Sequence, residues 1–337
     1  MLASASVSAV PLHDQELLAA DRVRVEEALL RAVRTDDAFL TEMASHLITA
    51  GGKRVRPLFS VACAAVTSEL GDATHEAVMG GVSVELVHIG SLYHDDVMDE
   101  AVIRRTVPSV NAKWGNLKAI LAGDFLLARA SEIAASLGVE VAGLLAATIA
   151  RLCEGQVREL QAMFSPDRTE AEYRESIAGK TASLFSAACR IGGLVANLER
   201  DQIEAVTAFG LHYGMAFQIV DDILDLTATE EILGKPAGND LVEGVYTLPV
   251  IHALAKPNQE KLRDILGEPL NEAEIDSVRL LVREAGGVES AFAAARAEVD
   301  AAAKALEPFA GSGSAIALIS AAEHLLESVS TIAKIDR

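Results

Sequence analysis

The chain has 337 residues, 50% of them hydrophobic but only 4% aromatic, and this mixture favours packed helices over a sandwich or barrel of strands. Its 29 basic and 49 acidic side chains give a net charge of −20, which argues against nucleic acid as a partner because a duplex-binding protein needs a basic face. Three cysteines, an odd and sparse set, are typical of buried thiols in a reducing compartment and predict a cytoplasmic protein.

The N-terminal residues have no basic region and reach Asp14 before any long apolar run, which does not fit a signal peptide. The stretch closest to a membrane span covers residues 133–150. It is short, rich in alanine and glycine, and interrupted by Glu140, so it predicts a buried core helix rather than a transmembrane segment.

Apolar residues recur at helical spacing along most of the chain, whereas the alternation typical of strands is scarce. Glycine, proline and small polar residues cluster at the breaks, for example at 51–52, 165–167 and 234–236. No linker or fixed-period repeat divides the chain, so we expect one all-α domain over residues 1–337. The pattern predicts helices over residues 14–34, 38–49, 56–69, 73–100, 109–136, 139–163, 169–178, 180–196, 200–228, 240–255, 271–284, 287–307 and 314–334.

The first charged motif is the segment 51–57, GGKRVRP, which places three cations in four residues at a glycine turn entering a helix. Pro57 stands where a first-turn proline is favoured. Backbone N–H groups at a helix start, together with fork-shaped guanidinium groups, suit the binding of a diphosphate. Taken singly, each cation reads as an ordinary exposed side chain.

The predicted helix 73–100 ends in a burst of aspartates at Asp95, Asp96 and Asp99. Carboxylates at a helix C-terminus oppose the helix dipole, so something positive should neutralise them. At 100° per residue, Asp95 and Asp99 lie about 40° apart on one face. Both can therefore reach a hard cation that keeps several waters and takes further oxygens from a phosphate.

The predicted helix 200–228 ends in the same pattern, Asp221, Asp222 and Asp225. One such triplet is weak as a signal, because acidic clusters on solvated helix ends are common. Two copies, each after a long apolar helix, predict that several Mg²⁺ ions are held around one diphosphate. The cations Arg104, Arg105, Lys180 and Lys235 complement them, and together the clusters predict a site for two diphosphates, one held through metal and one directly.

In order and approximate spacing, these motifs resemble the trans-isoprenyl (polyprenyl) diphosphate synthases of the long-chain type. The resemblance covers about residues 45–255 and implies an isoprenoid synthase-like fold, an all-α bundle of more than ten helices around a deep central cavity. It rests on the two DDxxD motifs, GGKRVRP, Arg104-Arg105, Gly179-Lys180-Thr181, Phe217-Gln218, and Gly234-Lys235-Pro236 with Asp240.

The resemblance also implies roles for individual residues. The three Mg²⁺ ions, with Mn²⁺ as a substitute, would lie among Asp95, Asp96, Asp99, Asp221, Asp222 and Asp225, the family depending most on the first aspartate of the second motif. The allylic diphosphate would be held by Arg104, Lys180, Gln218 and Lys235. Isopentenyl diphosphate would be held by Lys53, Arg56, His88 and Arg105. Thr181 would flank the carbocation, and the enzyme would be a homodimer.

One of these positions has a second interpretation, and two other positions depart from the family pattern. A lone helical histidine such as His88 is more often a core residue, although it lies only about 20° around the helix from Asp95. Val245 stands where the family commonly has a lysine, so one contact to the allylic diphosphate is missing. Thr106 stands where the family often has glycine, and nothing follows from that exchange at this level.

Product length should depend on what blocks the hydrocarbon tunnel below the first aspartates. Gly90 and Ser91 occupy positions where short-chain members typically carry an aromatic floor, so their small size predicts a long product. The alternative is that small residues here let two helices approach closely.

The expected reaction is ionisation of the allylic diphosphate, condensation with isopentenyl diphosphate and loss of a proton. A geranylgeranyl or farnesyl diphosphate synthase is the nearest alternative. A class I terpene cyclase would lack the GGKRVRP segment, a non-catalytic subunit would have eroded aspartates, and a structural metal-binding bundle would leave the basic cluster unexplained.

Overall fold

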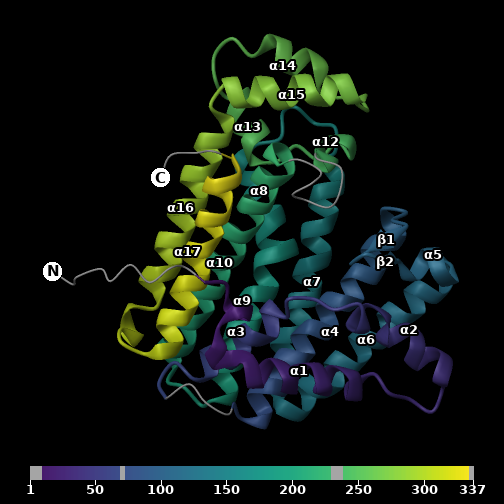
Figure 1. Ribbon diagram of the computed structural model, residues 1–337, viewed down its shortest axis with the longest axis vertical. Coiled ribbons are helices and arrows are strands. Elements are labelled where there is room, and N and C mark those ends of the chain that lie inside the picture. The colour runs from purple at the N-terminus through teal and green to yellow at the C-terminus, as the bar shows by residue number, and fades with distance from the viewer. Residues whose placement is uncertain (1–9, 69–72, 229–237, 334–337) are drawn as a thin grey trace.

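The computed structural model describes residues 10–68, 73–228 and 238–333, the last three as backbone only, and it is almost entirely helical (Figure 1). Its elements are η1 Leu12–Asp14, η2 Glu16–Leu18, α1 Ala19–Ala32, α2 Ala38–Thr49, α3 Val55–Ala64, α4 His75–Met98, β1 Ile103–Arg104, β2 Val107–Pro108, α5 Val110–Trp114, α6 Asn116–Leu137, α7 Val139–Gln161, α8 Glu170–Ile177, η3 Ala178–Ala182, α9 Ser183–Val195, α10 Arg200–Thr227, α12 Asn239–Val242, α13 Leu248–Leu254, α14 Glu260–Ile265, α15 Glu272–Glu284, α16 Gly287–Ala305, η4 Glu307–Phe309 and α17 Gly313–Ala333.

The expected all-α bundle of more than ten helices is confirmed. Several boundaries are wrong, however. A short antiparallel hairpin, whose strands β1 and β2 have two residues each, precedes the helix expected at 109–136, which is itself divided at Gly115. The helix expected at 240–255 is interrupted between α12 and α13 by Gly244 at φ 74°, and α14 was not expected at all. Among the described helices, none is long and apolar enough to cross a membrane.

Side-chain caps explain where several helices begin. Thr74 accepts from the Ala77 backbone N–H at the start of α4, and Thr169 with Glu172 forms a reciprocal capping box at the start of α8. These bonds satisfy backbone donors that a helix start leaves unpaired. At its other end α4 stops at Met98, and Glu100 adopts the left-handed conformation at φ 51°. The C-terminal carboxylates of α4 therefore lie where the chain turns away from the helix.

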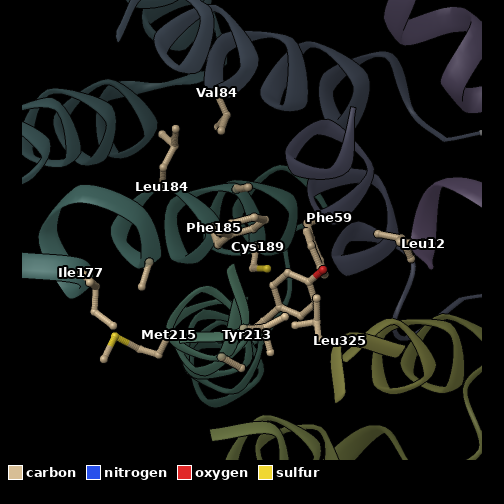
Figure 2. Close-up of a cluster of buried hydrophobic side chains, with 14 of the residues drawn as sticks. Leu12, Phe59, Val84, Ile177, Leu184, Phe185, Cys189, Tyr213, Met215 and Leu325 are labelled. Carbon is tan, nitrogen blue, oxygen red and sulfur yellow. The ribbon is translucent and has the colours of Figure 1, made fainter. Parts of the chain in front are cut away.

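Helix α9 lies between the two aspartate-bearing helices, since it packs against both α4 and α10, while α16 and α17 cover α10 (Figure 1). An aromatic cluster fixes this arrangement: the ring centroid of Phe59 lies 5.5 Å from that of Phe185 and 4.5 Å from that of Tyr213 (Figure 2). Burial of each such ring is worth roughly 1.5–3 kcal/mol relative to exposure. Three helices, α3, α9 and α10, are thereby held in one packed core that supports the ends of α4 and α10.

Candidate active site

Both aspartate motifs contribute to the wall of one polar cavity of about 460 Å³. Asp95 and Asp99 come from the end of α4, and Asp221 and Asp222 from near the end of α10. Asp240 of α12 lines the same space. The cavity thus brings together two acidic motifs that lie more than a hundred residues apart in the chain.

The remaining two predicted metal ligands do not line this cavity. Asp96 is fully buried and accepts from Arg104 Nε at 2.7 Å, with Arg104 Nη2 at 2.6 Å from the same oxygen. Asp225 is 4% exposed and accepts from the Asp240 backbone N–H at 3.1 Å. In this arrangement Asp96 orients Arg104, and Asp225 anchors α12.

Burial raises the pKa of two cavity carboxylates well above the ordinary aspartate range. Burial raises the pKa of Asp95 to about 6, partly opposed by the nearby Lys180 ammonium. Burial also raises the pKa of Asp222 to about 7, although hydrogen bonds from Tyr173 and Gln218 pull it down. Raised values mean that the ionised carboxylates lack enough positive charge around them, a situation that a bound cation would relieve.

A chain of hydrogen bonds fixes Asp222. The Tyr173 hydroxyl donates to Oδ2 at 2.5 Å, and the Gln218 amide donates to Oδ1 at 2.8 Å. The Gln218 carbonyl oxygen in turn accepts from the Thr181 hydroxyl at 2.7 Å. The predicted substrate-binding Gln218 and the predicted cation-flanking Thr181 therefore belong to one network, which reaches the second aspartate motif.

Lys180 projects from η3, a π-helical turn at the point where we expected an ordinary helix start. Its ammonium lies 2.5 Å from Glu159 Oε1 of α7. Burial lowers the Lys180 pKa, but Glu159, with Asp95 and Asp99, outweighs burial and raises it overall. The close backbone approach depends on Gly155, one turn before Glu159, because a Cβ there would meet the Lys180 backbone N and lie 2.8 Å from the Ser176 carbonyl oxygen.

Arg104 and Arg105 occupy the unexpected hairpin and face different surroundings. Arg104 lines the polar cavity. Arg105 donates from Nη1 to the carbonyl oxygens of Leu47 at 2.8 Å and Gly51 at 2.6 Å, so it holds the glycine turn of the GGKRVRP segment. The turn residues Arg105 and Thr106 both have positive φ, at 52° and 66°. Glycine favours that conformation, which explains why the family often has glycine at position 106, whereas the β-branched Thr106 is strained there.

A second cavity of about 430 Å³ adjoins the first and has mainly apolar walls. Leu92, Asp95, Lys180 and Thr181 line both cavities. Helix α7 supplies most of the opposite wall, with Leu152, Cys153, Gln156, Val157 and Leu160.

The two predicted chain-length positions are separated by the structure. Ser91 lines the apolar cavity, whereas Gly90 does not. A Cβ at Gly90 would lie 3.1 Å from the Gly123 carbonyl oxygen and 3.4 Å from Leu127 on α6. For Gly90 the structure supports the alternative of close helix packing, and the floor argument now concerns Ser91.

Arg56 and His88 lie together at the apolar cavity. Burial lowers the pKa of Arg56 to about 10, which leaves it charged at neutral pH, and its guanidinium stands 4.4 Å from the Phe185 ring centroid. Burial, reinforced by Arg56 and Arg105, moves the pKa of His88 well below its usual range, so its imidazole is neutral. A neutral imidazole can donate a hydrogen bond from one ring nitrogen and accept one at the other.

The other two cations of the GGKRVRP segment point in different directions. Arg54, left-handed at φ 49° and 2% exposed, is held by Glu26 at 2.8 Å and Glu85 at 3.2 Å, so its role is to anchor the segment. Lys53 is exposed and lines a third cavity of about 450 Å³, into which Asp221 also opens. Lys53 and the Arg56–His88 pair thus approach the aspartates from different cavities. Lys235 lies outside the described residues.

A sequence model of the polyprenyl synthetase family matches residues 37–283. The chain belongs to the polyprenyl synthetase family. It is accordingly a prenyltransferase, and the expected condensation of isopentenyl diphosphate with an allylic diphosphate is confirmed at the level of the family.

Three relatives illustrate the range of the family. The chain is 41% identical over 291 residues to a nonaprenyl diphosphate synthase of Mycobacterium tuberculosis, covering 85% of this chain and 86% of that one. It is 38% identical over 297 residues to a short chain isoprenyl diphosphate synthase of Methanothermobacter thermautotrophicus, covering 86% and 90%. A polyprenyl synthase of Caulobacter crescentus, solved with calcium and isoprenyl diphosphate, superposes with a TM-score of 0.87 at 33% identity over 95% of this chain and 98% of that one.

The polyprenyl synthetase site has the donor set for a divalent metal. Its cavity carboxylates are hard oxygen ligands, the kind that a divalent cation prefers. Within the described residues, no three histidine, cysteine or acidic side chains are already gathered into a complete ligand set. A cation held here would therefore complete its coordination with water and diphosphate oxygens.

Several residues of this polyprenyl synthetase site belong to none of the motifs found in the sequence. Glu159 pairs with Lys180, Tyr173 orders Asp222, and Arg168 stands in the cavity wall. The only local signal is the capping pattern at Thr169 and Glu172, which predicts the start of α8 and so the position of Arg168 just before it.

Proposed function

We propose that this enzyme makes a long-chain trans-polyprenyl diphosphate by repeated addition of isopentenyl diphosphate to an allylic primer, with three Mg²⁺ ions in the polar cavity. The observation that carries the proposal is the wall shared by the two cavities. Asp95, Lys180 and Thr181 face a carboxylate-lined space on one side and an apolar space on the other. A prenyl diphosphate has the same division, a charged head joined directly to a hydrocarbon tail.

The proposed partition of residues draws the allylic group from the polar cavity, whereas the group for isopentenyl diphosphate is spread over the apolar cavity, the third cavity and the glycine turn. Arg104, Lys180 and Gln218, with Lys235, would hold the allylic diphosphate beside Asp95, Asp99, Asp221 and Asp222. Arg56, His88 and Lys53, with Arg105, would hold isopentenyl diphosphate. We assign Asp96 and Asp225 to orienting roles because both are buried in contacts with Arg104 and Asp240.

The chemistry follows from these positions. Bound Mg²⁺ would supply positive charge that stabilises the departing diphosphate. The Lys180 ammonium and the Arg104 guanidinium would hold that leaving group as the allylic C–O bond breaks. The double bond of isopentenyl diphosphate then forms the new C–C bond to the allylic carbon. A proton leaves the adjacent carbon to restore an alkene, and the released diphosphate accepts it.

Water must be kept from the allylic cation, and the apolar cavity provides for this. Leu92, Leu152 and Leu160 line it, and the Thr181 hydroxyl is already engaged by Gln218. Since Ser91 leaves this cavity without an aromatic floor, the growing chain can extend past it. We therefore propose a product longer than geranylgeranyl diphosphate.

We further propose one domain, a cytoplasmic location and a homodimer. Three free cysteines are consistent with a reducing compartment. For the dimer, α6 presents an apolar face at Leu117, Ile120 and Leu121, which are 80%, 40% and 63% exposed. An exposed apolar stripe of this kind is typical of a protein interface.

The site assignment is tested by removing one carboxylate from each motif. Asp95→Ala and Asp221→Ala should each lower kcat by several orders of magnitude, at about 1.4 kcal/mol per tenfold, while helical content is retained. Glu243→Ala, which lines the same cavity outside the two motifs, is the matched control and should keep most activity. Near-normal turnover in either aspartate variant would refute the two-motif site.

A further inference from the structure

Arg168 is the one cation of the described cavity wall without a carboxylate partner. Arg104 pairs with Asp96, and Lys180 pairs with Glu159. Arg168 lines the same polar cavity, yet within the described part of the chain it forms no ion pair. Its charge contributes to lowering the pKa of Glu172, so among the described residues it is offset only at longer range.

The guanidinium of Arg168 is also short of hydrogen bonds. The side chain is 6% exposed, and only Nη1 donates, to the Tyr246 carbonyl oxygen at 3.0 Å. Nε and Nη2 are buried and have no hydrogen-bond partner among the described residues, and the carbon of the guanidinium lies 5.5 Å from the Tyr173 ring centroid. A buried cation with two orphan donors is costly, and the cost falls when an anion accepts from it.

The anchor on Tyr246 fixes where this charge lies. Tyr246 is flanked by Val245 and Thr247, both of which line the polar cavity. Val245 contributes no charge to that wall. Arg168 reaches the wall from the turn before α8. By its bond to the Tyr246 carbonyl oxygen, it brings a cation next to Val245.

We propose that Arg168 is a further substrate-binding residue, whose free N–H groups bind diphosphate oxygens of the allylic substrate. The inference rests on the function proposed above. We assign Arg168 to the allylic diphosphate rather than to isopentenyl diphosphate because it lines the same cavity as Arg104 and Lys180. It does not line the third cavity, which Lys53 lines. A guanidinium fork suits a diphosphate because parallel N–H groups can engage two oxygens at once.

The test compares Arg168→Met with Arg168→Gln. The glutamine keeps an N–H for the Tyr246 carbonyl and so should preserve the fold, while both variants remove the charge. We expect KM for the allylic primer to rise about tenfold or more in each, with KM for isopentenyl diphosphate changed by less than about twofold. Arg263→Met, which removes an exposed arginine paired with Asp167, is the control and should change neither.

A rescue variant separates substrate binding from support of the Tyr246 backbone. Val245→Lys in the Arg168→Met background restores a cation to the same wall without restoring the bond to Tyr246. We expect it to bring KM for the primer back to within about threefold of the original value. A well-folded Arg168→Gln with unchanged KM, or a double variant without any recovery, would overturn the inference.

Titration calorimetry with inorganic diphosphate and Mg²⁺ distinguishes this inference from the function on which it rests. Binding to the original protein and at least tenfold weaker binding to Arg168→Gln would support both. Equal binding to the two proteins would overturn the role of Arg168 alone. Absence of binding to the original protein would overturn the diphosphate site itself, and the role of Arg168 with it.

Discussion

The Tyr173 hydroxyl donates a 2.5 Å hydrogen bond to Asp222 Oδ2 inside the protein. Tyr173 is 1% exposed and Asp222 is 3% exposed, and both side chains line the polar cavity. With Gln218 on the other oxygen, the carboxylate is held in one orientation. A residue of α8 thus orders the second aspartate motif on α10.

Tyr173→Phe should therefore weaken both stability and metal use. Loss of the donor leaves a buried carboxylate oxygen unpaired, which typically costs about 1–3 kcal/mol. We expect a lower urea midpoint and a higher Mg²⁺ requirement for activity. Tyr246→Phe, whose hydroxyl instead accepts from the Gly267 backbone N–H, is the comparison and should destabilise without raising the Mg²⁺ requirement. An unchanged Mg²⁺ requirement in Tyr173→Phe would argue against the ordering role.

The raised pKa values of Asp95 and Asp222, about 6 and about 7, predict how stability depends on pH. Between about pH 4 and 7 the folded, metal-free protein keeps protons that the unfolded chain has released. The free energy of unfolding should therefore fall as pH rises through that range. Urea unfolding in a chelator measures it, and Asp222→Asn should make the fall shallower. Divalent metal binds the ionised form, so added Mg²⁺ should stabilise more as pH rises.

Gly155 is predicted to be required for the position of Lys180. A Cβ at Gly155 would meet the Lys180 backbone N of η3 and lie 2.8 Å from the Ser176 carbonyl oxygen of α8, so Gly155→Ala forces α7 away from both elements. Overpacking of this kind usually costs about 1–3 kcal/mol. We expect a lower melting temperature together with a reduced kcat, because the Lys180–Glu159 pair is displaced. Gly143→Ala on the same helix meets nothing within 4 Å and should be tolerated.

Ser91→Phe should shorten the product. The side chain lines the apolar cavity, so an aromatic ring there occupies space that the growing chain needs. Ser91→Ala is the size-matched control and should leave product length unchanged. Gly90→Tyr should instead lower the melting temperature, because Gly90 contacts the Gly123 backbone of α6. A stable Ser91→Phe enzyme with the original product would refute the assigned path of the chain.

The sequence predicted the parts of the site that local motifs specify. The paired aspartates lie at the ends of two helices, and helical spacing alone placed Asp95 and Asp99 on one face. Gly90 and Ser91 differ by one residue, hence about 100° around the helix, so only the packing of α6 and α7 could separate their roles.

Other features depend on contacts between distant segments. The burial of Asp96 requires Arg104 to return along a hairpin whose turn residues have positive φ, and its four strand residues are too few to show alternation. The π-helical turn at Lys180 has the same apolar pattern as an ordinary helix. Glu159 and Arg168 belong to no sequence motif. They become part of the site only because α7 and the loop before α8 pack against the cavity.

The most direct test of the account is the length of the product. Purified protein, isopentenyl diphosphate, Mg²⁺ and each allylic primer in turn would be incubated to completion, and the dephosphorylated products separated by chromatography. We predict prenyl chains longer than geranylgeranyl from every primer that is used, because the cavity beside Asp95 has no aromatic floor at Ser91. A product distribution that ends at farnesyl or geranylgeranyl would contradict this account.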